Sequence, residues 1–290
     1  MLDSLQALSD AIAAVVARAA PSVVTVRSHR ALSSGFAWRP GLVVTADEAL
    51  AEDGEITIAA AGGVVMPATL IGRDPSTDVA LLRVPHDSLP AIAFDAPAPA
   101  VGGLALTLGA RDGAPVAALG CIAHAGPAWR SLRGGEIAAR IELAAGLRGA
   151  SEGGLALDAS GRALGMAVFG PRRRTLVIPG ATVERVAEHL LRHGRIARGY
   201  LGLKLQPTRL DGGAGMGAMV MGVEAGGPGA LAGLHQGDVI AAWDGQPFEG
   251  VAALLRDLGP ESVGRRVTLA VRRGGGVADC VLVIGERPAG

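Results

Sequence analysis

The stretch from Gly146 to Val168, GLRGASEGGLALDASGRALGMAV, decides the fold of this chain. A glycine-rich loop, GASEGG, is followed by two short apolar segments, Leu155–Leu157 and Ala163–Val168, which a turn at 158–162 separates. Apolar runs of this length on either side of a turn rich in Asp, Ser and Gly are typical of a β-hairpin. The stretch therefore predicts a hairpin with a glycine-rich loop at its mouth.

The same loop contains a second pattern. Gly149-Ala-Ser-Glu-Gly153 satisfies G-x-S-x-G, the nucleophile elbow of α/β-hydrolases. Such an elbow needs a strand before it and a helix after it. Because a hairpin follows here, we favour the hairpin interpretation over the elbow.

The overall composition indicates a globular chain without charge bias. Hydrophobic residues make up 49% of the 290 residues, enough for one large or two medium domains with their own cores. Lys+Arg and Asp+Glu both number 27, so no electrostatic attraction to nucleic acid or to an anionic membrane is expected. Cys121 and Cys280 lie far apart in apolar runs, which predicts two buried free thiols and no disulfide.

The first residues, MLDSLQALSDAIAAVVARAAPS, predict an amphipathic helix over 4–19. Pro21 ends the apolar pattern. No basic residue precedes the apolar part and Arg18 interrupts it, so the segment has the features of neither a signal peptide nor a membrane span. We therefore expect a cytoplasmic location.

From residue 22 onward, short apolar segments alternate with turns at intervals typical of all-β sandwiches and barrels. A Pro- and Ala-rich stretch at 89–103 separates two runs of such segments, which predicts two similar barrels. A helix over 182–193, with Thr182 as N-cap and Gly194 as stop, closes the second run.

The composition changes after Arg198, where mixed short strands and two short helices predict a separate small α+β domain. We expect three parts: an N-terminal helix over 1–20, a β-barrel region over 21–197 and the α+β domain over 198–288.

The barrel region resembles the trypsin-like domain of HtrA-type serine proteases over roughly 20–196. Besides the hairpin stretch, which is similar to the family's G-x-S-G-G loop, three segments carry the resemblance: APSVVTV at 20–26, SGFAWRPGLVVTA at 34–46 and GRDPSTDVALLRV at 72–84. The resemblance implies a mainly β fold, a double six-stranded barrel followed by the small α+β domain.

The resemblance also implies where a catalytic triad would lie. Asp78, within GRDPSTDVALLRV, matches the family's aspartate. Glu48 stands where the family has histidine, and Glu152 stands where it has the nucleophilic serine. Ser151 lies one residue too early, and Ala150 replaces the glycine that is usual in the loop whose N–H groups at 150 and 152 stabilise an oxyanion.

These replacements remove the groups on which serine-protease chemistry depends. A serine hydroxyl needs a base with a pKa near 7, and Glu48 is a much weaker base than histidine. A carboxylate at Glu152 is a poor nucleophile toward an amide, and its charge opposes an oxyanion. We expect a pseudoprotease. The alternative is an active ATP-independent serine endopeptidase of protein quality control, with Ser151 as a relocated nucleophile.

The carboxylates of Glu48, Asp78 and Glu152 also suit Ca²⁺, Mg²⁺ or Mn²⁺. We favour a decayed site in which arginines such as Arg148 neutralise the carboxylates, so no metal or cofactor is expected. None of the 6 histidines falls at the base position, and His29, at the end of the first strand, is the one to locate in a structure. We interpret the run 172–174 as a solvated turn.

The second domain resembles a PDZ domain of the kind that follows HtrA-type proteases. Its signature segments are GYLGL at 199–203, GPGALAGL at 227–234 and GDVIAAWDGQP at 237–247. The resemblance implies that peptides or C-terminal segments of proteins bind there as an added strand. It assigns the binding residues to two places, the carboxylate loop and the helix after it: Tyr200, Leu201, Gly202 and Leu203, then Val251, Leu254 and Leu255. It also implies a homo-oligomer, a trimer formed through the N-terminal helix.

Overall fold

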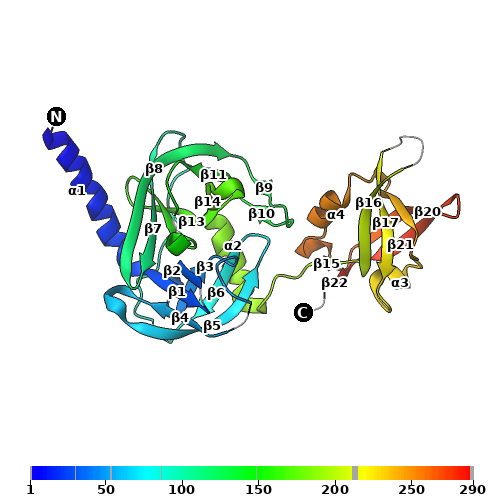
Figure 1. The fold of residues 1–290 in the computed structure, drawn as a ribbon, viewed down its shortest axis with the longest axis horizontal. Helices are drawn as coiled ribbons and strands as arrows, with labels where there is room; N and C mark the ends of the chain where they lie inside the picture. The colour runs from blue at the N-terminus through cyan, green and yellow to red at the C-terminus, as the bar shows by residue number, and fades with distance from the viewer. Residues whose placement is uncertain are drawn as a thin grey trace. The chain divides into compact units, whose positions relative to one another are not determined.

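The computed structural model describes residues 2–29, 31–52, 54–85, 87–147, 149–210 and 215–287 (Figure 1). Arg148, named above, lies outside these ranges. The α-helices are α1 (Leu2–Ala19), α2 (Gly180–His193), α3 (Pro228–Leu231) and α4 (Val251–Asp257). Short 3₁₀ helices are η1 (Ala20–Ser22), η2 (Ala61–Gly63), η3 (Gly149–Ser151), η4 (Pro171–Arg173) and η6 (Pro260–Ser262).

The strands fall into three groups along the chain. The first comprises β1 (Val23–Ser28), β2 (Ala31–Arg39), β3 (Leu42–Thr45), β4 (Ile56–Ala59), β5 (Val65–Asp74) and β6 (Val79–Arg83). The second comprises β7 (Leu104–Arg111), β8 (Ala114–Gly126), β9 (Trp129–Arg130), β10 (Glu136–Ile137), β11 (Arg140–Leu143), β12 (Leu155–Asp158), β13 (Ala163–Phe169) and β14 (Thr175–Pro179). The third comprises β15 (Gly199–Tyr200), β16 (Leu203–Arg209), β17 (Met216–Val223), β18 (Val239–Trp243), β19 (Gln246–Pro247), β20 (Arg266–Arg273), β21 (Gly276–Val283) and β22 (Gly285–Glu286).

The chain divides into two compact units. The first unit comprises Met1–Trp129 and Glu136–Ile196, and the second comprises Arg130–Gly135 and Ala197–Gly290. Within the first unit, β1-β2-β3-β6-β5-β4 and β11-β14-β13-β12-β7-β8 each close into a barrel (Figure 1). The predicted mainly β fold with two six-stranded barrels is therefore confirmed.

Apolar strands buried on both faces hold the barrels together. Along β6, Val79 and Leu81 belong to the core that both barrels share with α2, whereas the intervening Ala80 and Leu82 belong to a separate core of the first barrel. Successive side chains of a strand point to opposite faces, so a strand with a core on each side is apolar throughout. This arrangement explains the uninterrupted run VALL.

The hairpin predicted from 146–168 is present. Leu155–Leu157 pairs with Met166, Gly165 and Ala163 of β13 in antiparallel register. The turn between the strands is closed by Asp158, whose Oδ1 accepts the backbone N–H groups of Ser160 at 2.8 Å and Arg162 at 3.0 Å. A carboxylate that binds nearby backbone N–H groups stabilises such a turn.

The predicted helices at 4–19 and 182–193 are both present, as α1 and α2. Val15 and Ala19 of α1 are buried in the shared core, while Leu5 is 61% and Leu8 is 44% exposed. Gly194 ends α2 with φ 73°, as expected. The assignment of Thr182 as N-cap is wrong: α2 begins at Gly180, and the Thr182 hydroxyl accepts the N–H of Ala138 at 2.9 Å.

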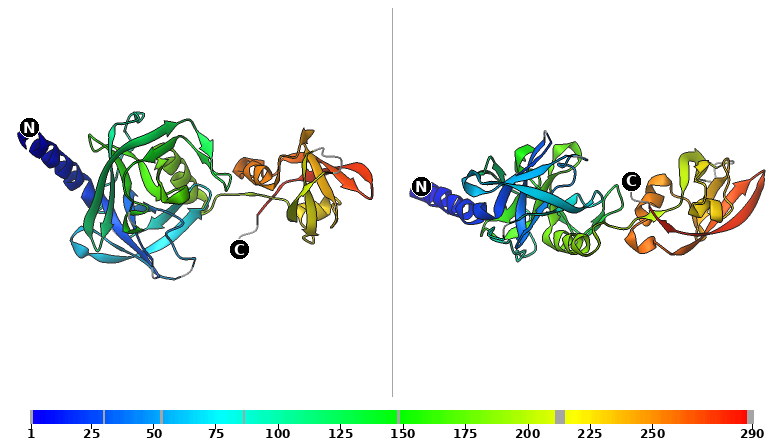
Figure 2. Two further views of the ribbon diagram at one scale, coloured as in Figure 1. Left: turned by 45° about the horizontal axis from the view of Figure 1, so that its top comes forward. Right: turned by 90° about the horizontal axis from the view of Figure 1, so that it is seen from below.

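The second unit is a sheet with the order β16-β17-β18-β20-β21, to which β19 adds beside β18. Figure 2 shows β20 and β21 of this sheet, coloured orange to red, as a long hairpin. The turn predicted at Asp244 and Gly245 joins β18 to β19, with φ angles of 48° and 77°. Two positive φ angles in a two-residue turn match the twist of a hairpin.

Cys121 and Cys280 are free, as predicted, although each is only partly buried. In the described part of the chain, no helix combines the length and the apolar character that a membrane crossing requires.

Candidate functional site

Asp78 lies at the end of a loop that is held closed by hydrogen bonds between residues of the loop itself. The carboxylate of Asp74 accepts the N–H of Ser76 at 3.0 Å, the hydroxyl of Ser76 at 2.5 Å and the hydroxyl of Thr77 at 2.7 Å. Asp74, Ser76 and Thr77 are all buried, so these bonds satisfy groups that water does not reach. The loop delivers Asp78 to the start of β6 with φ 59°, a left-handed conformation that aspartate tolerates.

Glu48 lies in the segment after β3 and meets Asp78 through its backbone. Its N–H donates to Oδ1 of Asp78 at 2.8 Å, while the Glu48 side chain is exposed. The preceding residue, Asp47, is buried and forms an ion pair with Arg73. Arg73 Nη2 also donates to the Asp47 carbonyl at 3.0 Å. One arginine thus connects the chain before Glu48 to the chain before Asp78.

Glu152 follows η3 in the second barrel. Hydrogen bonds from Ser34 in the first barrel fix the loop that contains it. The N–H of Ser34 in β2 donates to the Glu152 carbonyl at 2.8 Å. The buried Ser34 hydroxyl donates to the Ala150 carbonyl at 2.6 Å and accepts the N–H of Ala110 at 2.8 Å. Sequence reasoning missed Ser34, because these partners come from three segments that only the fold brings together.

The loop conformation determines what its N–H groups can bind. The N–H of Glu152 donates to the Gly149 carbonyl at 3.2 Å, inside the 3₁₀ turn, so one of the two expected oxyanion donors is used within the loop. Ala150 is buried and has no positive φ, so this conformation suits an alanine. Ser151 is only 3% exposed, and its Cα and Cβ pack against Gly109.

Burial and negative charge raise the pKa of Asp78. The pKa of this carboxyl is raised from 3.8 to about 8, mainly by burial, and the carboxylates of Glu48, Glu152 and Asp47 contribute to the rise. The N–H of Glu48 lowers the pKa by less than burial raises it. At neutral pH, Asp78 is therefore mostly a neutral acid.

Glu152 is half-buried, and burial also raises the pKa of its carboxyl. The backbone N–H of Phe169 lowers this pKa, the carboxylate of Glu48 raises it and the guanidinium of Arg173 lowers it. Arg173 itself stacks on the ring of Phe169 at 4.2 Å. The run 172–174 is an exposed turn, as expected, with φ 58° at Arg172 and 56° at Arg173.

The Glu48 carboxylate is close enough to raise the pKa of both Asp78 and Glu152, and no described histidine contributes to these two shifts. His29 is exposed in the turn after β1 and has φ 51°. Within the described ranges, no group of three or more His, Cys, Asp or Glu side chains is arranged to hold a metal ion.

In the second unit, the residues expected to bind peptides lie in two segments. Tyr200 ends β15, Leu201 is buried, Gly202 has φ 66° and Leu203 begins the edge strand β16. None of the described hydrogen bonds is donated by the backbone N–H of Leu201 or Gly202. These two N–H groups are therefore available to a carboxylate.

The helix α4 supplies the second segment and contacts β16. Val251 is partly buried and packs against the core of this unit, and Leu255 is 52% exposed. Leu254 is only 4% exposed and is a core residue. An exposed apolar side chain beside an edge strand is the arrangement that a β-strand ligand uses.

Comparison with known proteins identifies both domains. Residues 33–166 match the family model of the trypsin-like peptidase domain, and residues 199–282 match that of the PDZ domain. A probable periplasmic serine endoprotease, DegP-like, of Brucella suis is 31% identical over 264 residues, covering 84% of this chain and 50% of the relative. A DegP-like relative of Chlamydia pneumoniae is 28% identical, covering 88% of this chain and 55% of the relative.

Solved structures show the same organisation. The serine endoprotease from Yersinia pestis has a TM-score of 0.72 and 26% identity, covering 94% of this chain and 97% of that one. The HtrA-type protease AlgW with tripeptide has a TM-score of 0.67 and 26% identity, covering 96% and 98%.

These findings bear on two expectations, the loss of activity and the cytoplasmic location. The chain spans about half the length of the curated relatives it matches. The relatives are named endoproteases, so the comparisons favour the alternative of an active protease over the expected loss of activity. The expected cytoplasmic location is wrong, because the relatives are named periplasmic. The chain is an HtrA/DegP-type serine protease homologue, with a trypsin-like peptidase domain followed by a PDZ domain.

Proposed function

We propose that this chain is a periplasmic, peptide-binding member of its family in which the barrel site has lost serine-protease chemistry. The observation that carries the proposal is the presence of Glu48 and Glu152 at two of the three positions that the family resemblance assigns to the triad, with the pKa of Asp78, at the third, raised to about 8. A neutral carboxyl cannot stabilise an imidazolium, and no histidine of the described ranges is among the groups that act on Asp78.

The loop conformation supports the same proposal. Oxyanion stabilisation requires N–H groups that are already directed at the site of developing charge. Here the N–H of Glu152 donates to the Gly149 carbonyl instead. The Glu152 carboxylate also adds a negative charge to the loop that would have to stabilise the oxyanion. Loss of a single triad member lowers kcat by roughly 10⁴ to 10⁶.

We assign peptide binding to the PDZ domain, along β16 and α4. The available N–H groups of Leu201 and Gly202 would accept a terminal carboxylate, and the exposed Leu255 would contact an apolar side chain. The HtrA-type protease AlgW has been solved with a tripeptide, which supports peptide binding by a chain of this family.

We also propose that the chain assembles as a trimer through α1. The exposed Leu5 and Leu8 are an apolar surface that a second copy would cover. Light scattering at micromolar concentration should show an assembly larger than a monomer, and a stable monomer would contradict this part of the proposal.

The names of the relatives favour a second candidate, an ATP-independent serine endoprotease of protein quality control. In this chain it would require Ser151 as nucleophile, although the buried Ser151 would first have to leave its contact with Gly109. A fluorophosphonate probe distinguishes the candidates. We expect no labelling of the wild type. Labelling that Ser151→Ala abolishes would establish the endoprotease.

A further inference from the structure

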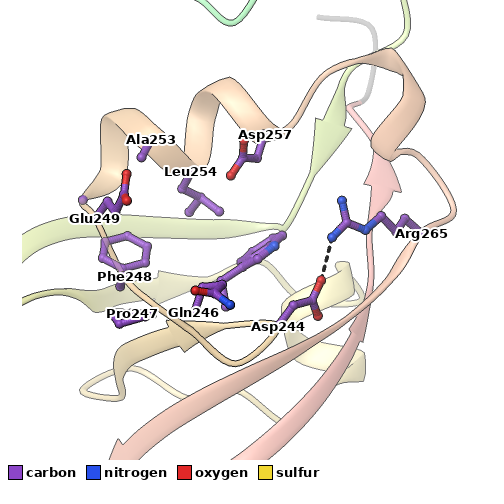
Figure 3. Close-up of a pocket in the computed structure, with 11 residues that line it drawn as sticks. Asp244, Gln246, Pro247, Phe248, Glu249, Ala253, Leu254, Asp257 and Arg265 are labelled. Atoms are coloured by element: carbon purple, nitrogen blue, oxygen red, sulfur yellow. Dashed lines mark hydrogen bonds and ion pairs between the residues drawn. The ribbon is translucent and has the colours of Figure 1, made fainter.

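A pocket lies on one flank of α4 in the PDZ domain (Figure 3). Successive helical residues turn by about 100°, so residues four apart share a flank. Leu254 and Leu258 face the core. Val251 and Leu255 lie on one side of that core stripe, and Ala253 and Asp257 lie on the other. The pocket includes Ala253, Leu254 and Asp257; of the residues assigned above to peptide binding it shares Leu254 alone, whose side chain is a core residue, so the two surfaces lie on opposite flanks of α4.

The pocket has an apolar floor. It has a volume of about 390 Å³, and its apolar lining includes Trp243, Phe248 and Leu254. Phe248 is 5% and Leu254 is 4% exposed, so packing holds both side chains in place. Trp243 is partly buried and ends β18. Such a floor suits a ligand with a flat or aliphatic part.

One wall of the pocket is fixed by Asp244. Its Oδ2 accepts a hydrogen bond from Arg265 at 2.6 Å, drawn in Figure 3, and its Oδ1 accepts the N–H of Thr268 at 2.8 Å. These bonds lower the pKa of Asp244, the Thr268 N–H contributing most. The charge of Asp244 is thus neutralised within the wall.

Two further carboxylates have no such partner. Glu249, just before α4, and Asp257, at its end, line the pocket from the helix side, and both are exposed (Figure 3). None of the described hydrogen bonds or ion pairs of this domain involves either side chain. The pocket therefore combines an aromatic floor with a rim of two unneutralised negative charges.

We propose that this pocket binds the side chain of an arginine in a polypeptide partner. The aliphatic stem of arginine covers apolar surface while its head group stays near water, and its planar guanidinium stacks on aromatic rings. The Glu249 and Asp257 carboxylates complement the positive charge. The site lies beyond the function proposed above and does not depend on it, because it requires no C-terminal carboxylate.

The test uses the full chain with fluorotryptophan in place of its 3 tryptophans, Trp38, Trp129 and Trp243. The variant Trp243→Phe identifies the fluorine NMR signal of residue 243. The probe is the blocked peptide acetyl-Gly-Arg-Gly-amide, which has no terminal charges. We expect a saturable shift of the Trp243 signal alone, with a Kd of about 1 mM, and no shift with the citrulline peptide, which has the same shape without the charge.

Matched charge variants locate the site. Glu249→Gln and Asp257→Asn should each raise the Kd about threefold, the effect of one exposed carboxylate. Asp279→Asn removes an exposed carboxylate from β21 of the same domain and should leave the Kd unchanged. An equal shift with the citrulline peptide, an equal effect of all three variants or the absence of a saturable shift would overturn the proposal. Loss of C-terminal peptide binding would leave this result intact, so the two proposals fail separately.

Discussion

The backbone N–H of Glu48 donates a 2.8 Å hydrogen bond to Oδ1 of Asp78. In a serine-protease triad the aspartate accepts a hydrogen bond from an imidazole N–H, whereas the donor here is a backbone N–H. A backbone N–H cannot take up or deliver a proton during the reaction. The geometry of the aspartate position is thus preserved by a group that holds the carboxyl in place without catalytic chemistry.

The raised pKa of Asp78 predicts that stability falls with rising pH. The folded pKa of about 8 lies above the ordinary value of 3.8, so the folded state binds a proton that the unfolded state has released. The free energy of unfolding should fall between about pH 4 and pH 8 and level off above that window. Asp78→Asn should remove this part of the pH dependence and raise stability at pH 8.

Chemical denaturation of wild type and Asp78→Asn across this pH range is the measurement, with the exposed Asp279→Asn as control. The difference between Asp78→Asn and wild type should grow with pH, whereas the control should follow the wild type. A constant difference for Asp78→Asn would show that Asp78 titrates normally.

The ion pair between Arg73 and Asp47 should be important for stability. The Asp47 side chain is 4% exposed, so Arg73→Met removes the guanidinium that pairs with a buried charge. We expect a loss of about 3 kcal/mol in the free energy of unfolding. The exposed pair of Arg192 and Glu188 is the control, since the Arg192 side chain is 69% exposed and Arg192→Met should cost less than about 0.5 kcal/mol. Similar losses in both variants would contradict the assignment.

Gly153 should tolerate no side chain. A Cβ there would lie 2.4 Å from the Ser34 carbonyl oxygen and 2.7 Å from the Ala46 nitrogen, and its φ is 80°. Gly153→Ala should lower the free energy of unfolding by about 2 kcal/mol or more through overpacking and strain. Gly146→Ala meets no atom within 4 Å and serves as control. Thermal unfolding measures both, and an unchanged Tm for Gly153→Ala would show that the loop adjusts freely.

Peptide capture by the PDZ domain should depend on Leu255 and on a free C-terminus. A peptide with an apolar C-terminal residue should bind with about micromolar Kd, near −8 kcal/mol, and amidation of its terminus should abolish binding. Leu255→Asp should weaken binding about tenfold. Leu231→Asp on α3 introduces the same change at an 82% exposed leucine and should have no effect. Equal affinity for the amidated peptide would exclude carboxylate capture.

The sequence predicts those elements that depend on residues close together in the chain. The hairpin at 155–168, the helices α1 and α2 and the turn at Asp244 all follow from apolar spacing and from Gly or Asp at fixed positions. The triad positions came from the resemblance, since Glu48, Asp78 and Glu152 are separated in the chain and no local pattern connects them.

Other features depended on tertiary contacts. Thr182 has the residue type of an N-cap, but its hydroxyl accepts the N–H of Ala138, which lies 44 residues earlier in the chain. Ser34 is one of several serines, and only the closed barrels give its hydroxyl two backbone partners. The direction of the Glu152 N–H does not follow from the sequence. In the structure the N–H donates to the Gly149 carbonyl, inside the turn that η3 forms.

The most direct test is hydrolysis of unfolded casein by the wild type and by variants that restore the triad. We expect no hydrolysis above background by the wild type or by either single variant, Glu48→His or Glu152→Ser, because triad members act as a unit. The double variant should show weak activity around Asp78, and adding Ala150→Gly should increase it by freeing the loop. Robust hydrolysis by the wild type that Ser151→Ala abolishes would contradict the account and identify Ser151 as the nucleophile.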